Sequence, residues 1–136
     1  MSNQKTLSII KPDAVKAGHV DSINLMIENS GLKILEKKEI KLSKEEAQQF
    51  YAVHSDKPFY KELCEFMTSG PIIVQMLEGE NAIELYRKVM GATNPEEAEE
   101  NTIRKKFATS IQENAVHGSD SEDNALKELN FFFKDI

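Results

Sequence analysis

The run IIVQML at residues 72–77 constrains the fold most, because it is apolar almost throughout. A short apolar run of this kind predicts a buried strand. The run TLSII at residues 6–10 predicts another, since it contains β-branched residues and stops just before Pro12. Residues 33–42, KILEKKEIKL, suit a third strand, whose charged middle faces solvent or lies near the edge of a sheet.

Helical patterns separate these strands. Apolar residues recur at helical spacing over residues 20–30 and meet Gly31, a residue that commonly ends a helix. Two further helices open on capping patterns, in which a serine or asparagine precedes a glutamate by three residues. These patterns are Ser43 with Glu46 and Asn81 with Glu84. Helices are expected at residues 20–30, 43–51, 59–70, about 81–90 and about 121–133.

Residues 92–113 form a long connection with a turn at Asn94-Pro95 and no sustained strand. A connection of this length within a compact domain is usually functional or part of an interface. A short strand is expected after it, near Ala115–Val116. Four strands with helices between them predict an α+β fold, namely a ferredoxin-like βαββαβ sandwich with helices packed on a four-stranded antiparallel sheet.

Composition excludes several classes of protein. The 136 residues fit one domain over 1–136, and 17 basic against 23 acidic side chains give a net charge of −6. That balance argues against broad binding of duplex DNA, which needs a basic face. Cys64 is the only cysteine, so no internal disulfide is possible. Because neither a signal peptide nor a membrane span is visible, a soluble cytoplasmic protein is expected.

The motif NAVHGSDS at residues 114–121 is the strongest candidate for chemistry. It places His117 at the expected end of a strand, where Gly118 frees the backbone and the next residues can start a helix. Neutral imidazole so placed could attack a phosphoryl group. A metal site is the weaker alternative, because the other histidines lie far away at positions 19 and 54. A histidine that only packs is the third interpretation.

Other candidate residues are ambiguous when taken singly. No glycine-rich phosphate loop is present, so phosphate binding would depend on side chains. Arg87 and Arg104 are the only arginines and could act as phosphate forks, although two surface arginines are the simpler interpretation. Lys11 ends a buried strand and could bind a ligand or merely be solvated. Tyr51 and Phe59 could pack between helices or clamp a nucleobase.

Taken together and in order, these stretches resemble the nucleoside diphosphate kinase family from about Thr6 to Phe133. The resemblance rests on NAVHGSDS, IIKPDAVKAG, YAVHSDKPFY, SGPIIVQMLEGENAI, YRKVMGATNP and NTIRKKFA. It implies the ferredoxin-like fold and transfer of a γ-phosphoryl group, commonly from ATP, to a nucleoside diphosphate. It also implies a ping-pong mechanism through a phosphohistidine, with Mg²⁺ held mainly by the nucleotide phosphates and not by metal ligands of the protein.

The resemblance also assigns roles to residues. His117 would carry the phosphoryl group, and Glu128 would orient its imidazole with help from the Ser119 hydroxyl. Tyr51 would lie close to this histidine and to the γ-phosphate. Contacts to phosphate or ribose are implied for Lys11, His54, Arg87, Thr93, Arg104 and Asn114. Contacts to the base are implied for Phe59, Leu63 and Ile111.

The chain departs from the family pattern in one stretch. Asn101 stands where glycine is usual, and Lys105-Lys106 replaces a Gly-Asp pair, so a salt bridge through that aspartate is not available. The resemblance further implies a homo-oligomer, either a tetramer or a hexamer built from dimers, with no membrane and no specific nucleic acid as partner. The competing hypotheses are a nucleotide-binding or phosphohistidine regulatory module without turnover and a structural assembly unit without an active site.

Overall fold

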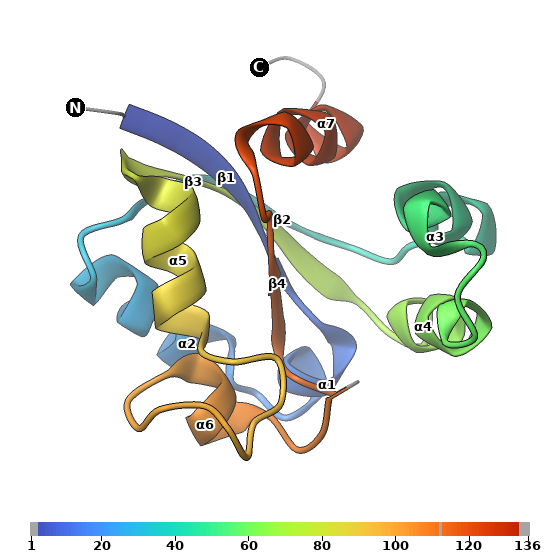
Figure 1. Ribbon diagram of the computed structural model, residues 1–136, viewed down its shortest axis with the longest axis horizontal. Coiled ribbons are helices and arrows are strands. Elements are labelled where there is room, and N and C mark those ends of the chain that lie inside the picture. The colour runs from blue at the N-terminus through green and yellow to red at the C-terminus, as the bar shows by residue number, and fades with distance from the viewer. Residues whose placement is uncertain (1–2, 112, 134–136) are drawn as a thin grey trace.

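The computed structural model describes residues 3–111 and 113–133, so the ends of the predicted domain and residue 112 of the long connection lie outside the described residues. Four strands form one sheet in the order β2-β3-β1-β4, and every neighbouring pair is antiparallel (Figure 1). The strands are β1 Asn3–Ile10, β2 Lys33–Ile40, β3 Ile72–Glu80 and β4 Val116–Gly118. The predicted ferredoxin-like fold class is therefore confirmed.

The helices cover both faces of this sheet. They are α1 Pro12–Lys16, α2 Val20–Asn29, α3 Lys44–Phe50, α4 Tyr60–Met67, α5 Ala82–Met90, α6 Ile103–Phe107 and α7 Glu122–Phe132, with the 3₁₀ turn η1 Ala52–His54. The sequence did not predict α1 or α6, because five residues are too few to show helical periodicity. Local signals fix them instead: α1 begins at a proline, and the Thr102 side chain accepts from the Lys105 amide at the start of α6.

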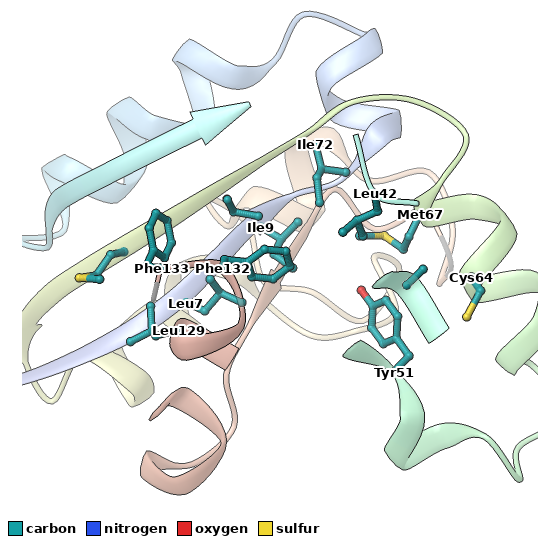
Figure 2. Close-up of a cluster of buried hydrophobic side chains, with 13 residues drawn as sticks. Leu7, Ile9, Leu42, Tyr51, Cys64, Met67, Ile72, Leu129, Phe132 and Phe133 are labelled. Atoms are coloured by element: carbon teal, nitrogen blue, oxygen red, sulfur yellow. The ribbon is translucent and has the colours of Figure 1, made fainter. Parts of the chain in front are cut away.

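Two hydrophobic clusters lie on opposite faces of the sheet. One joins β1 and β3 to α3, α4 and α7, and Figure 2 shows its side chains, including Tyr51, Cys64 and Phe132. The other lies under α2, α5 and α6 and contains the buried Tyr86 and Met90. In Figure 1 α5 runs beside β1 and β4, whereas α3 and α4 lie away on the other side. The strand β4 is thus held between the two layers at one edge of the sheet.

The backbone conformation shows that one of the two predicted helix caps is wrong, and it explains why asparagine suits position 101. The predicted capping box at Ser43 is present, with both reciprocal hydrogen bonds. The one at Asn81 is wrong: this residue is left-handed (φ 51°), its side chain makes no cap bond, and Gln4 Oε1 accepts from the Ile83 amide instead. Asn101 is also left-handed (φ 69°), a conformation that asparagine tolerates better than most side chains do.

The edge strand β2 bears out the expectation from its charges. It pairs only with β3 among the described strands, and its middle residues are exposed. Cys64 is buried on α4, as expected for a small apolar side chain. No helix of the described part of the chain is both long and apolar enough to cross a membrane.

Candidate active site

The site is built around His117, the middle residue of β4. Alternation along the strand points the imidazole to the face covered by α3 and α7, while Gly118 faces α5. The side chain keeps 23% of its surface exposed, and it opens onto a cavity of about 460 Å³. A histidine at the wall of a cavity of this size can meet a small-molecule substrate.

One imidazole nitrogen is already committed. His117 Nε2 lies 3.0 Å from Glu128 Oε1 on α7, and Ser119 Oγ donates to the same oxygen at 2.8 Å. Ser119 is buried and its oxygen also accepts from the Leu7 amide. A carboxylate can only accept, so the proton sits on Nε2 and the lone pair of the neutral ring sits on Nδ1. The structure thus brings together these three residues, which the resemblance groups at the active site.

Polar side chains from three other segments line the same cavity. Arg87 reaches it from α5 and His54 from η1, as the resemblance implied for both. Asp120 lines it too, and a hydrogen bond from Asn124, followed by the positive charge of Arg87, lowers the pKa of its carboxyl. Besides Glu128, the cavity therefore presents the Arg87 guanidinium and the Asp120 carboxylate around the imidazole.

Aromatic and apolar side chains form the remaining wall. Phe50 packs edge-on against the His117 ring, with 5.7 Å between ring centroids, and Phe131 lies beside it. Sequence reasoning missed Phe50 and placed its neighbour Tyr51 near the histidine. Tyr51 does not line the cavity but lies in the core, where its hydroxyl has no partner among the described residues (Figure 2). Burial, and then the negative charge of Glu128, raises the pKa of Tyr51.

A strained turn leads into β4. Ala115 has φ 74°, and the Val116 amide donates to the Asn114 carbonyl across it, which makes a γ-turn in the unfavourable left-handed form. The Ala115 amide donates to Asp13 Oδ2 at 3.2 Å, and its carbonyl accepts from the Lys11 amide at 2.8 Å. These bonds hold the strain next to the histidine. Sequence reasoning missed Asp13, although it directly follows the Lys11-Pro12 pair.

Lys11 and Asn114 form a buried pair at this turn. Lys11 Nζ donates to Asn114 Oδ1 at 2.8 Å, and the Asn114 amide nitrogen donates to the Thr93 carbonyl at 3.4 Å. Burial lowers the pKa of Lys11 to about 8, helped by the positive charge of Arg104 and opposed by Asp13. The structure thus brings together three predicted residues, the Lys11 and Asn114 side chains and the backbone carbonyl of Thr93. The Lys11 ammonium loses its proton at a lower pH than an exposed lysine does.

Arg104 does not line the cavity. It is buried, and its guanidinium donates to the carbonyls of Asn114, Gly91 and Val116 at 3.3, 3.1 and 2.9 Å. Burial lowers the pKa of this group. The planar fork expected for a phosphate is engaged here with the backbone, and it ties the end of α5 to the start of β4.

The residues expected to contact a base do not line the cavity at His117. Phe59 is 46% exposed at the start of α4, with its ring centroid 5.5 Å from that of His54. Ile111 is 60% exposed in the connection before β4. Leu63 is half-buried and packs against the core. Phe59 and Ile111 are therefore exposed on different segments, while Leu63 packs α4, the helix that follows Phe59, against the core.

The side chains that commonly bind metal ions are dispersed over the described part of the chain. Among residues 3–111 and 113–133, no group of three or more histidine, cysteine or carboxylate side chains could hold a metal ion. Of the two carboxylates that line the cavity, Glu128 already accepts from His117 and Ser119. This leaves Asp120 as the carboxylate of the cavity that could meet a cation carried by a ligand.

Comparison with known proteins gives a consistent result. A family model described as nucleoside diphosphate kinase matches residues 4–136. A nucleoside diphosphate kinase of Rhodovulum sulfidophilum is 59% identical over 136 residues (100% of this chain and 97% of the relative). One of Campylobacter curvus is 60% identical over 130 residues (96% and 95%).

Solved structures agree. The nucleoside diphosphate kinase of Aquifex aeolicus has a TM-score of 0.95 at 41% identity and covers 97% of this chain and 96% of its own. A halophilic one of Halobacterium salinarum, in complex with CDP, has a TM-score of 0.94 at 37% identity (98% and 90% covered).

Proposed function

The chain belongs to the nucleoside diphosphate kinase family, and from this premise we propose that His117 carries the phosphoryl group in its reaction. The enzyme transfers the γ-phosphoryl group of a nucleoside triphosphate to a nucleoside diphosphate by a ping-pong mechanism through a phosphohistidine. One observation carries the assignment of the residue. His117 Nε2 is bound to Glu128 Oε1 at 3.0 Å, which leaves the Nδ1 lone pair as the nucleophile beside the cavity.

In the first half-reaction the Nδ1 lone pair attacks the γ-phosphorus. A bond forms between Nδ1 and phosphorus, the bond to the β,γ-bridging oxygen breaks, and the nucleoside diphosphate leaves with that electron pair. The ring gains positive charge without losing a proton. Glu128 balances this charge through the proton on Nε2, and Ser119 holds the carboxylate in place. The second half-reaction reverses these bonds with a terminal phosphate oxygen of the acceptor.

Cations around the imidazole supply the charge stabilisation that phosphoryl transfer needs. Arg87 lines the cavity and would contact the phosphates directly. Lys11, bound to Asn114, would turn its ammonium toward the transferred phosphoryl group. Arg104 and Thr93 would join them if the connection before β4 rearranges around the nucleotide.

Kinases of this family need a divalent metal ion, and we propose Mg²⁺. The ion would be held mainly by the nucleotide phosphates, with Asp120 as the protein carboxylate that fits a contact to it. When bound, it neutralises charge on the phosphates. The protein's own residues still provide the nucleophile and its orientation.

The base would stack between Phe59 and Ile111, supported by Leu63. Stacking contributes affinity for any base, whereas hydrogen bonds to base edges would reject some of them. The relative from Halobacterium salinarum forms a complex with CDP, which supports a nucleotide ligand here. A homo-oligomer built from dimers and a cytoplasmic location remain predictions, which mass measurement in solution and fractionation of cells would test.

Labelling tests the proposal. Incubation with γ-labelled ATP and Mg²⁺ should give an acid-labile, base-stable phosphoprotein, and GDP added afterwards should take the label as GTP. Ser55→Ala, on an exposed turn, serves as the matched control and should label normally. A wild-type protein that takes no label would refute the proposed phosphohistidine mechanism. Label retained by His117→Ala would refute the assignment of the nucleophile.

A further inference from the structure

A buried polar cluster lies behind the nucleophile, on the opposite face of the sheet. Ser8, Gln75 and Tyr86 are each 0% exposed. The Tyr86 hydroxyl shares a 2.7 Å hydrogen bond with Ser8 Oγ, and Gln75 Nε2 donates to the same oxygen at 3.3 Å. Polar side chains in such a place fix geometry, because sliding the helix or strand would leave them unsatisfied.

The cluster is in register with β4. Ser8 is the cross-strand partner of Gln75 on one side and of Gly118 on the other. The three therefore form one row across the sheet, and Tyr86 lies over this row from α5. Gly118 is the residue next to His117, so the ring of Tyr86 lies directly behind the strand that carries the imidazole.

The contact between Tyr86 and Gly118 leaves no free space. A methyl group added at Gly118 would lie 2.8 and 2.9 Å from two carbons of the Tyr86 ring and 2.7 Å from the end of Met90. The methionine tip can move, but the ring is held by its hydrogen bond to Ser8. Gly118 is not among the glycines with positive φ, so close approach and not backbone conformation is what favours glycine there.

The helix that holds this ring also carries a residue of the cavity. Arg87 follows Tyr86 on α5 and lines the same cavity as His117. Arg104 ties the end of that helix to β4 by donating to the carbonyls of Gly91 and Val116. The separation of Arg87 from the imidazole is thus set by two connections between α5 and β4, of which the Tyr86–Gly118 contact lies nearer to the histidine.

We propose that Tyr86 is a positioning residue for phosphoryl transfer, which sets through Gly118 and Ser8 the place of His117 relative to Arg87. This inference rests on the proposed function. A phosphate held by Arg87 must meet Nδ1 at attacking distance, and a misplacement of about 1 Å can cost about 100-fold in rate. Tyr86 touches no substrate, so its loss should slow the chemical step and leave nucleotide affinity unchanged.

Single-turnover kinetics test this with saturating labelled ATP and Mg²⁺. Gly118→Ala should slow formation of the phosphohistidine by roughly 100-fold, while the Kd for ADP stays within about threefold. Tyr86→Phe, which keeps the ring and loses the hydroxyl, should slow it by about threefold to tenfold. The double variant Gly118→Ala/Tyr86→Leu, whose leucine is flexible and lacks the ring, should recover at least about tenfold over Gly118→Ala alone.

A control separates positioning from stability. Ile27→Ala removes a fully buried side chain of the same hydrophobic cluster without touching Gly118. It should lower Tm and keep the wild-type rate well below that temperature. A wild-type rate in Gly118→Ala, no recovery in the double variant, or equal slowing by Ile27→Ala would each overturn the inference while the wild type still labels. A wild type that takes no label would overturn the proposed function with it.

Discussion

Replacing Lys11 by methionine should remove a specific part of the pH dependence of folding. The ammonium is buried, and its Nζ donates to Asn114 Oδ1 at 2.8 Å. Burial and then the charge of Arg104 lower the pKa of Lys11 from 10.5 to about 8. At pH values between these two, the unfolded chain holds a proton on Lys11 that the folded chain has released, so a rise in pH favours folding.

The magnitude follows from the two pKa values. Below about pH 8 the folded protein bears the full cost of a buried ammonium, about 3 kcal/mol at 1.36 kcal/mol per pKa unit. Near pH 10 most of that cost is gone. The free energy of unfolding of the wild type should therefore rise by about 2.5 kcal/mol between about pH 7 and pH 10, relative to that of Lys11→Met. The loss of the bond to Asn114 is the same at both values and cancels.

Urea unfolding followed by circular dichroism measures this difference. Wild type and Lys11→Met are compared at four pH values from about 7 to 10. Lys16→Met is the matched control, because Lys16 is exposed at the end of α1, the short helix that begins directly after Lys11, and it should parallel the wild type. Parallel curves for wild type and Lys11→Met would show that Lys11 is not desolvated in the folded protein and would refute the reasoning.

Three further changes have definite expected outcomes. Glu128→Gln should slow phosphohistidine formation by about 10-fold to 100-fold, because the ring that becomes positively charged on phosphorylation loses a charged acceptor. Rapid-quench labelling measures this rate, and a wild-type rate would contradict the role of Glu128. Arg104→Lys should lower the free energy of unfolding by about 1–3 kcal/mol, since one ammonium cannot replace three hydrogen bonds to backbone carbonyls. An unchanged midpoint of urea unfolding would contradict this. Asn101→Ala should cost about 1 kcal/mol in the same assay because φ is 69°, whereas Asn101→Gly should not; equal stability of the two variants would count against backbone strain there.

The regular elements could be predicted where the chain shows a long enough pattern. The run at 72–77 is the first part of β3, the run at 6–10 is the last part of β1, and the helical spacing at 20–30 is α2. Both strands extend further than their apolar cores, because the residues beyond them complete the ladder between β1 and β3. The short α1 and α6 escaped prediction, since caps and contacts define a five-residue helix more than periodicity does.

The site was predictable in its parts and not in its arrangement. The motif NAVHGSDS singles out His117 and Ser119, and the resemblance adds Glu128, which the structure places within hydrogen-bond distance of both. No pattern indicates Phe50 against the imidazole or Asp13 at the strained turn, because these contacts join segments far apart in the chain. Nor could spacing tell that Arg104 binds backbone carbonyls, since an arginine fork fits a carbonyl as well as a phosphate.

The sequence by itself determined the type of the longer strands and helices, the fold class and the proposed nucleophile, His117, because periodicity and a dense motif are local properties of a chain. Tertiary structure decided which nitrogen of His117 is free, how far burial discharges Lys11 and where Tyr86 lies behind Gly118. Each of these depends on what surrounds a group in space. Desolvation, hydrogen-bond partners and close packing are set by neighbours that only the folded chain brings together.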